Sequence, residues 1–309
     1  MKIVYMGTPE FAVGPLKALC ENGFEVALVV SRPDRARGRG KKIQSPPVKE
    51  AAEYYGIPVM QPERLKGDKA FAQALGDVGA DLIVTAAYGQ ILPAEILQAP
   101  RLGCVNIHAS LLPKYRGAAP IQRAIMAGER ETGVTLMWMA EEMDAGDVIA
   151  SRKAEIGRKA ASELFGELSG LGAALLIDML PGLASGTAPR QQQDHGLATY
   201  APMIRKEEGR VDFTQAPEAI ERLIRGLDPQ PGAYAIFRGA PLKLWGAEPS
   251  GIRHEEAPGT VISADSNGIA VSAGGRAILL TELQAPGKKA MAAADFIRGN
   301  RIAAGETMS

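Results

Sequence analysis

Short apolar runs alternate with amphipathic segments over the first 185 residues of the chain. This alternation is typical of parallel sheets, because a helix follows each strand and covers the sheet. We therefore predict an α/β domain with a Rossmann-like, doubly wound parallel sheet. The apolar runs of strand length are residues 2–6, 24–31, 81–86, 105–108 and 134–139, and the segments of helical period are 11–21, 47–55, 118–127 and 161–178.

The pattern changes after residue 188. Residues 189–205 are rich in Gln and Pro and show no clear period, and one amphipathic helix follows at 217–227. Beyond it, Pro and Gly divide short strands, which predicts a small β-barrel. We expect an N-terminal domain at 1–188, a linker at 189–205 and a C-terminal domain at 206–309. The five predicted strands of the second domain are 233–237, 242–245, 259–262, 269–272 and 277–280.

Asn106 and His108 alternate with Val105 and Ile107 at the end of a predicted strand. This period of two places both polar side chains on one face. An amide and a protonated imidazole can each donate a hydrogen bond to an oxyanion, and an imidazole exchanges protons near neutral pH. Either side chain alone is more often a hydrogen-bonded structural residue. Together on one face, they are a candidate catalytic pair.

Asp144 lies in a Gly-containing turn after the apolar run 134–140. Open α/β sheets place their ligand sites at the carboxyl ends of strands, so we expect this carboxylate beside the pair, where it would orient the imidazole. The alternative at this point is an Asp that only caps its own turn.

Composition adds few constraints. The 35 Lys and Arg balance the 35 Asp and Glu, so the overall charge points to neither a nucleic acid nor a membrane as partner. Cys20 and Cys104 lie in apolar surroundings without metal-ligand spacing, which predicts reduced core thiols and no metal site. With no leader and no membrane span expected, the protein is predicted to be cytoplasmic.

Basic charge is concentrated at residues 32–42, where six basic residues and one acid occupy eleven positions around Gly38 and Gly40. A loop of this composition cannot bury itself, and its charges suit phosphates. The alternative is that the run is only a solvated surface. The turn 7–11 after the first strand lacks GxGxxG, which disfavours a dinucleotide site.

Further segments combine with these motifs into one recognisable order. They are GTPEF at 7–11, PDR at 33–35, GRGKK at 38–42, AYG at 87–89, ILP at 91–93, and residues 103–108, 110–120, 144–147, 206, 211–213 and 285–291. In order and approximate spacing, the whole chain resembles the methionyl-tRNA formyltransferase family. Phe213 stands where that family would be expected to have Trp.

The resemblance implies a formyltransferase domain followed by a barrel similar to the oligonucleotide-binding (OB) fold. It implies that 10-formyltetrahydrofolate gives its formyl group to the α-amino group of methionine on initiator methionyl-tRNA, in a monomer without metal or membrane partner. The implied catalytic residues are Asn106, His108 and Asp144. The folate donor is expected to contact Tyr88, Gly89, Ser110, Leu111, Leu112 and Pro113, and the tRNA acceptor arm to contact Arg39, Lys41, Lys42, Lys206, Lys288 and Lys289.

Three other classes of protein share parts of this pattern. Glycinamide ribonucleotide transformylases resemble the N-terminal domain but lack both the basic loop and the barrel. A bifunctional sugar-nucleotide formyltransferase would need a second enzymatic domain with its own dinucleotide fingerprint, and a noncatalytic RNA-binding protein would tolerate loss of the catalytic trio. The trio argues for an enzyme, and the loop with the barrel argues for a tRNA acceptor.

Overall fold

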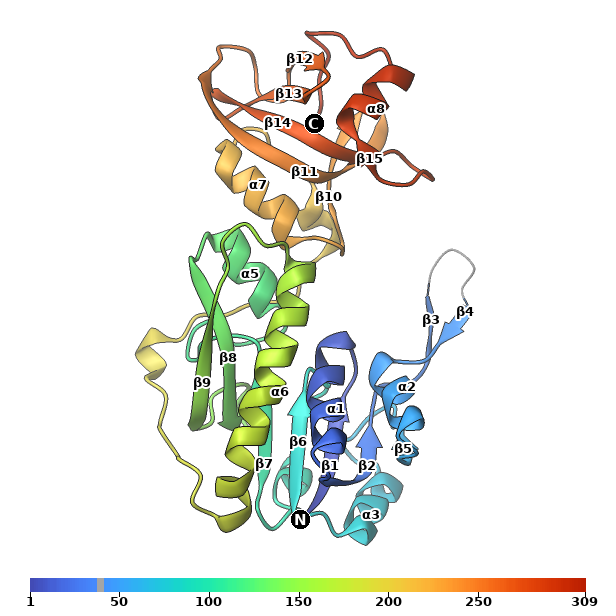
Figure 1. The fold of residues 1–309 in the computed structure, drawn as a ribbon, viewed down its shortest axis with the longest axis vertical. Coiled ribbons are helices and arrows are strands. Elements are labelled where there is room, and N and C mark those ends of the chain that lie inside the picture. Colours follow the sequence, from blue (N-terminus) through green and yellow to red (C-terminus); the bar gives the residue numbers. More distant parts are fainter. Residues whose placement is uncertain (38–41) are drawn as a thin grey trace. The chain divides into compact units, whose positions relative to one another are not determined.

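The computed structural model describes residues 1–37 and 42–309, which form two compact units (Figure 1). The first unit comprises Met1–Pro120, Glu131–Glu155 and Leu164–Pro202, and the second comprises Ile121–Arg130, Ile156–Glu163 and Met203–Ser309. The second unit therefore includes two segments that the sequence division assigns to the first domain. The domain limits at residues 188 and 206 stay a prediction.

The first unit is built on a seven-stranded sheet with the order β5-β2-β1-β6-β7-β8-β9. The chain runs outward from β1 through β2 to β5 and returns to β6 on the other side of β1, so the strand order reverses between β1 and β6. The strands are β1 (Lys2–Gly7), β2 (Glu25–Val30), β5 (Val59–Met60), β6 (Leu82–Ala86), β7 (Cys104–His108), β8 (Glu131–Trp138) and β9 (Val148–Glu155).

The predicted parallel arrangement is confirmed from β5 to β7, whereas β8 is antiparallel to β7 and β9 is antiparallel to β8. A hairpin loop at 139–147 connects β8 to β9 directly, and a short connection of this kind requires antiparallel strands. The sheet is therefore mixed. Strand β9 has no counterpart in the predicted strands, because exposed polar residues alternate with its few buried ones at the sheet edge.

Helices and a short hairpin complete the first unit. Among the described residues, α6 (Ala161–Ser185) is the one helix long and apolar enough to cross a membrane. Its leucines at 164, 168, 176, 180 and 183 are fully buried, and a Cβ on Gly172 would lie 2.7 Å from Ile107 Cγ2, so α6 packs directly on β7 as a core helix. The other elements are α1 (Val13–Glu21), β3 (Arg35–Arg37), β4 (Lys42–Gln44), α2 (Pro47–Tyr54), α3 (Lys69–Val78) and α4 (Ala94–Leu97).

The second unit contains an antiparallel sheet with the order β10-β11-β14-β13-β12, and β15 pairs with β14. All five predicted strands are present, which confirms a small β domain. Residues 305–309 exchange backbone hydrogen bonds with Ile236 of β10 and with Val261 of β12, so they bridge the two edge strands and close the sheet. The strands are β10 (Ala233–Phe237), β11 (Ala240–Arg253), β12 (Val261–Asp265), β13 (Gly268–Ala273), β14 (Arg276–Gln284) and β15 (Met291–Ala292).

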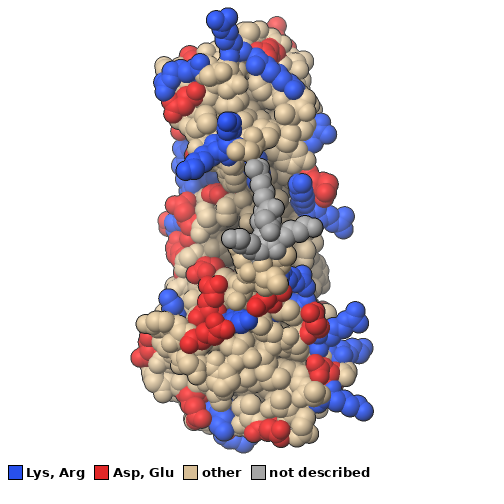
Figure 2. All heavy atoms as spheres, turned by 90° about the vertical axis from the view of Figure 1, so that its right-hand side faces the viewer, with Lys and Arg blue, Asp and Glu red and all other residues tan. Residues whose placement is uncertain are grey.

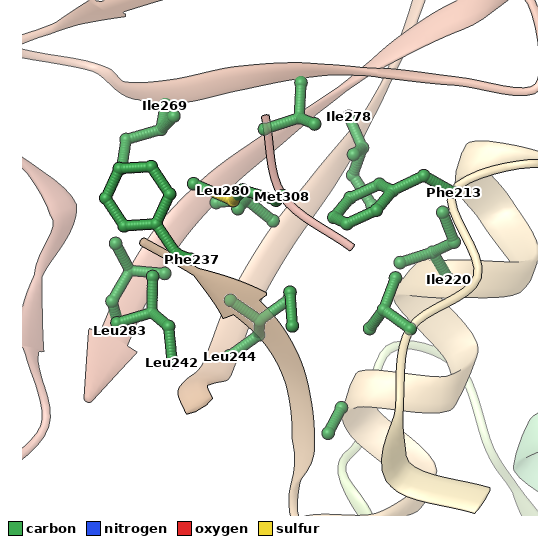
Figure 3. Close-up of a cluster of buried hydrophobic side chains, with 14 of the residues drawn as sticks. Phe213, Ile220, Phe237, Leu242, Leu244, Ile269, Ile278, Leu280, Leu283 and Met308 are labelled. Carbon is green, nitrogen blue, oxygen red and sulfur yellow. The ribbon is translucent and has the colours of Figure 1, made fainter. Parts of the chain in front are cut away.

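One apolar cluster fills this closed sheet (Figure 3). Phe213 and Ile220 approach it from the side of α7 (Pro217–Gly226), and Phe237, Leu280 and Met308 approach it from the strands and the closing segment. Phe213 is almost fully buried here, so an apolar aromatic ring satisfies this position without a polar partner. The remaining α-helices of this part of the chain are α5 (Pro120–Ala127) and α8 (Ala293–Gly299).

The closing segment carries an ion pair with a measurable consequence. Arg238 donates to both carboxylate oxygens of Glu306, at 2.7 and 2.8 Å, and the Ala303 amide donates to the same carboxylate. These hydrogen bonds, that of Arg238 foremost, lower the pKa of Glu306 to about 2. The ion pair should contribute its full stabilisation above about pH 4.3, the pKa of a Glu side chain in an unfolded chain. This contribution should be lost as the pH falls through about 2, the pKa of Glu306 in the folded protein.

Titration of the Glu306 carboxyl by NMR should therefore show a midpoint near 2, and Arg238→Ala should raise it. The effect on stability should be small, since solvent screens the exposed pair. Arg298→Ala, which removes a different surface cation, is the control and should leave the Glu306 midpoint in place. A midpoint that is the same in Arg238→Ala and in the parent protein would contradict the assignment.

Candidate active site

Asn106 and His108 project from the end of β7, next to β6. Thr85 of β6 is the register partner of Asn106, and its hydroxyl donates to Asn106 Oδ1 at 2.8 Å. With Oδ1 engaged in this way, Nδ2 is the atom through which Asn106 can donate to a substrate oxygen. Asn106 as a whole is partly buried, so part of this residue is accessible to solvent.

The imidazole of His108 is buried and is oriented by two groups. Its Nε2 lies 2.9 Å from the Tyr115 carbonyl oxygen, which can only accept, so Nε2 carries a hydrogen. Its Nδ1 lies 3.7 Å from Asp144 Oδ2. This distance is too long for a hydrogen bond but suits an ion pair when Nδ1 is protonated. The carboxylate therefore faces the ring nitrogen that does not contact Tyr115.

Asp144 lies in the loop between β8 and β9, with a left-handed backbone at φ 53°. The Gly117 amide donates to Asp144 Oδ2 at 2.8 Å, which fixes the carboxylate toward the loop that follows β7. The turn itself is tight, since a Cβ on Gly146 would lie 1.9 Å from the Trp138 carbonyl oxygen. The structure thus brings together the three residues predicted from separate motifs, and their catalytic role stays a prediction.

Residues 110–113 form a turn that is fixed to β8. Thr135 of β8 donates through its hydroxyl to the Ser110 carbonyl at 2.7 Å, and the Leu112 amide donates to the same hydroxyl at 3.1 Å. The Ser110 hydroxyl is buried and donates to the Lys114 carbonyl, and the Leu112–Pro113 peptide is cis. Ser110 is therefore occupied within the turn, whereas the side chains of Leu111, Leu112 and Pro113 are partly exposed.

Tyr88 and Gly89 follow β6. Since β6 and β7 are parallel neighbours, these residues lie at the same end of the sheet as the carboxyl end of β7. The Tyr88 ring packs in the core with Leu92 and Ile96, and burial raises its pKa to about 12. Its carbonyl accepts a hydrogen bond from the Thr8 hydroxyl at 2.9 Å. Gly89 is exposed with φ 86°. The main chain of this loop, rather than the tyrosine ring, is what the structure offers to a ligand.

Two buried polar residues support the site and were not singled out from the sequence. Arg116 is 1% exposed and Gln193 is 7% exposed, and the guanidinium donates to Gln193 Oε1 through Nε and Nη2. Gln193 Nε2 donates to the carbonyls of Asp144 and Gly146, at 2.9 and 2.7 Å. A glutamine within the polar segment 189–205 carries no sequence signal that distinguishes it from its exposed neighbours Gln191 and Gln192.

The basic residues expected to contact tRNA fall into two groups. Arg39 and Lys41 lie outside the described residues, and Lys42 begins β4 with a side chain that is not described. At the base of this hairpin, Lys49 pairs with Asp34 at 2.8 Å, and its hydrogen bond lowers the pKa of the Asp34 carboxyl. Lys206, Lys288 and Lys289 are exposed in the second unit.

Surface charge is mixed on the face drawn in Figure 2, where Lys and Arg stand among Asp and Glu on both the upper and the lower part. Lys243, another lysine of the second unit, donates to the Pro231 carbonyl and lies over the Trp245 ring, 5.1 Å from its centre. The ammonium group of Lys243 is therefore engaged in contacts within the second unit. No group of three or more potential metal ligands occurs among residues 1–37 and 42–309.

Comparison with known proteins shows which family the chain resembles. Residues 1–168 match the family described as formyl transferase, and residues 203–301 match the formyl transferase C-terminal domain. The chain is 46% identical to the methionyl-tRNA formyltransferase of Bacillus velezensis over 99% of this chain and 97% of that protein. It is 48% identical to that of Halalkalibacterium halodurans over 97% of this chain and 95% of that protein.

Solved structures show the same fold at lower identity. WlaRD, a sugar 3N-formyltransferase crystallised with dTDP and 5-N-formyl-THF, is 20% identical with a TM-score of 0.66, over 94% of this chain and 99% of that one. HypX from Aquifex aeolicus in complex with tetrahydrofolic acid is 20% identical with a TM-score of 0.63, over 96% of this chain and 47% of that one. Sequence identity to proteins of one name over nearly the whole chain decides the family: the chain belongs to the methionyl-tRNA formyltransferases.

Proposed function

We propose that this enzyme transfers the formyl group of 10-formyltetrahydrofolate to the α-amino group of methionine on initiator methionyl-tRNA. The observation that carries the proposal is that Asn106 and His108 share one face of β7 and that Asp144 Oδ2 lies 3.7 Å from His108 Nδ1. The chain matches methionyl-tRNA formyltransferases over both of its parts, which favours a charged tRNA as acceptor. A cytoplasmic monomer is the form we expect.

The proposed chemistry requires a group that accepts negative charge and a group that manages a proton. The methionine amine attacks the formyl carbon, a new C–N bond forms, and the formyl oxygen becomes an oxyanion. Asn106 Nδ2 is one assigned donor to this oxygen. The other is the Nε2 hydrogen of His108, which the Tyr115 carbonyl accepts in the free enzyme and which we assign to the oxyanion in the transition state. As the intermediate collapses, the C–N bond to the folate breaks, and the proton lost by the amine goes to the folate nitrogen. Asp144 holds the imidazolium during this exchange.

The donor site fits a flat, partly apolar ligand. Leu111, Leu112 and Pro113 offer partly exposed apolar side chains, and the loop at Tyr88 and Gly89, which follows the neighbouring strand β6, offers main-chain polar groups. Pockets for small molecules combine such apolar walls with a few polar groups that fix orientation. In support, a solved relative of this fold is in complex with tetrahydrofolic acid. We assign these residues to the pterin portion of the donor.

The acceptor can be tested directly by competition. Labelled formyl from 10-formyltetrahydrofolate should go to methionyl-tRNA when glycinamide ribonucleotide and a dTDP-amino sugar are present at equal concentration. The sugar acceptor is included because structures of similar fold are sugar N-formyltransferases. Transfer to either small amine in preference to the tRNA would overturn the proposed acceptor, and no transfer at all would overturn the proposed reaction.

The proposed tRNA contacts predict a specific kinetic change. Arg39→Ala in the basic loop, and Lys288→Ala combined with Lys289→Ala, should raise the KM for charged tRNA several-fold with little change in kcat. Contacts from cations to phosphates weaken with salt, so the dependence of tRNA binding on ionic strength should also fall. Lys17→Ala, an exposed lysine on α1, is the matched control and should change neither. A normal KM with a normal salt dependence in the variants would remove these residues from the tRNA interface.

A further inference from the structure

We infer that Gln193 is a positioning residue for formyl transfer, which acts by holding the backbone of the Asp144 turn. The inference rests on the proposed role of Asp144. Residue 193 lies in the segment between α6 and the second unit, far along the chain from the turn that it contacts. It is buried beside that turn rather than exposed as part of a linker.

The chemistry of its neighbours fixes which way the Gln193 amide points. A guanidinium has only donors, so Arg116 must face the amide oxygen, with Nη2 to Oε1 at 2.8 Å. Carbonyl oxygens only accept, so the carbonyls of Asp144 and Gly146 must face Nε2. These three contacts and that of Arg116 Nε with Oε1 agree with a single orientation of the amide. Gln193 therefore spans a buried cation on one side and both ends of the Asp144-Ala145-Gly146 turn on the other.

Arg116 is in turn fixed by the same segment and by its neighbours. Its amide donates to the Thr199 carbonyl at 2.8 Å, and its carbonyl accepts from the Ala201 amide at 2.7 Å. Nη2 also lies 3.2 Å from His195 Nδ1. Residues 193–201 thus run as a strap beside the loop that carries Tyr115 and Gly117, the partners of His108 and Asp144.

The bonds from Gln193 hold the part of the turn from which the Asp144 side chain projects. Asp144 has a left-handed backbone, and its Oδ2 has to stay near both the Gly117 amide and His108 Nδ1. Two hydrogen bonds from one planar amide to the carbonyls of residues 144 and 146 restrict rotation of the turn. A shift of about 1 Å in the carboxylate would weaken its attraction for the imidazolium, which is the state that donates to the oxyanion.

Two substitutions separate this role from simple packing. Gln193→Met keeps the volume and removes every polar contact. Gln193→Glu keeps acceptors for Arg116 but directs a carboxylate oxygen at the two carbonyls, where it cannot donate. We expect both to lower kcat about 10-fold to 100-fold, by analogy with the loss of residues that orient metal ligands, with KM for both substrates changed less than about two-fold. Gln192→Ala, the exposed neighbour, should retain full activity.

The decisive experiment is a double-mutant cycle with Asp144→Asn, with melting temperatures measured for every variant. If Gln193 acts through Asp144, adding Gln193→Met to Asp144→Asn should lower kcat little further. Multiplicative losses in the double variant, or a fall in kcat that only follows the melting temperature, would overturn the inference. Full activity in Asp144→Asn would instead overturn the proposed catalytic role of Asp144 itself, and full activity in Gln193→Met alone would overturn only the positioning role.

Discussion

His108→Ala should lower kcat for formyl transfer by about 10² to 10³, with a smaller change in KM. The reason is that the oxyanion loses a hydrogen bond that forms only in the transition state. The alanine leaves Tyr115 O and Asp144 Oδ2 without the ring between them. Asn106→Ala should have an effect of similar size, since it removes the other donor. Steady-state rates at saturating donor and saturating tRNA measure both.

The control for this experiment is His254→Ala. His254 is a partly buried imidazole, and its Nδ1 lies 3.4 Å from Glu256, so the substitution removes a comparable contact between an imidazole and a carboxylate within the second unit. Its kcat should match that of the parent protein. If His108→Ala kept more than about a tenth of the parent kcat, the assignment of His108 as an oxyanion donor would be wrong.

Gly146→Ala should be the most damaging single-methyl substitution in the site. The new Cβ would lie 1.9 Å from the Trp138 carbonyl oxygen, a backbone atom that also marks the end of β8. Neither group can move without moving the turn, so we expect a loss of kcat of at least 10²-fold and a destabilisation of about 1–3 kcal/mol from overpacking. Thermal unfolding and the rate assay on the same sample measure the two effects.

Gly170→Ala serves as the matched control for the added methyl group. Gly170 lies on the exposed side of α6, with no atom within 4 Å of a built Cβ. Alanine is the better helix former by up to about 1 kcal/mol, so this variant should be slightly more stable and fully active. Gly146→Ala with both parent activity and parent stability would mean that the turn is not as tightly held as the structure indicates.

Local patterns were sufficient for much of the fold and for the placement of Asn106 and His108 on one face of a strand. The strand at 104–108 could be predicted because its alternation is short and regular, and the same alternation placed Asn106 and His108 on one face. The five strands of the second unit could be predicted because Pro and Gly separate them. In these cases the information lies within a few consecutive residues.

What could not be predicted depends on partners distant in the chain. Strand direction is one example, since nothing within 131–155 indicates that β8 and β9 turn back against β7. Helix α6 is another, because it continues through Pro181, where the sequence predicted its end, and the loss of one N–H donor is tolerated so near its last turn. Gln193 is the third, since its role depends on Arg116 and on the turn at 144–146.

The assignment of α5 to the second unit has a consequence for the order of folding. Arg123 of α5 forms an ion pair with Glu208, and a Cβ on Gly226 of α7 would lie 2.8 Å from Met126. The packing partners of α5 are therefore synthesised much later than α5 itself. The same helix begins directly after the loop that holds His108 and Asp144. During translation, α5 should therefore reach its packed position only after α7 has been synthesised. A chain interrupted before α7 should therefore leave α5 without the residues that pack against it.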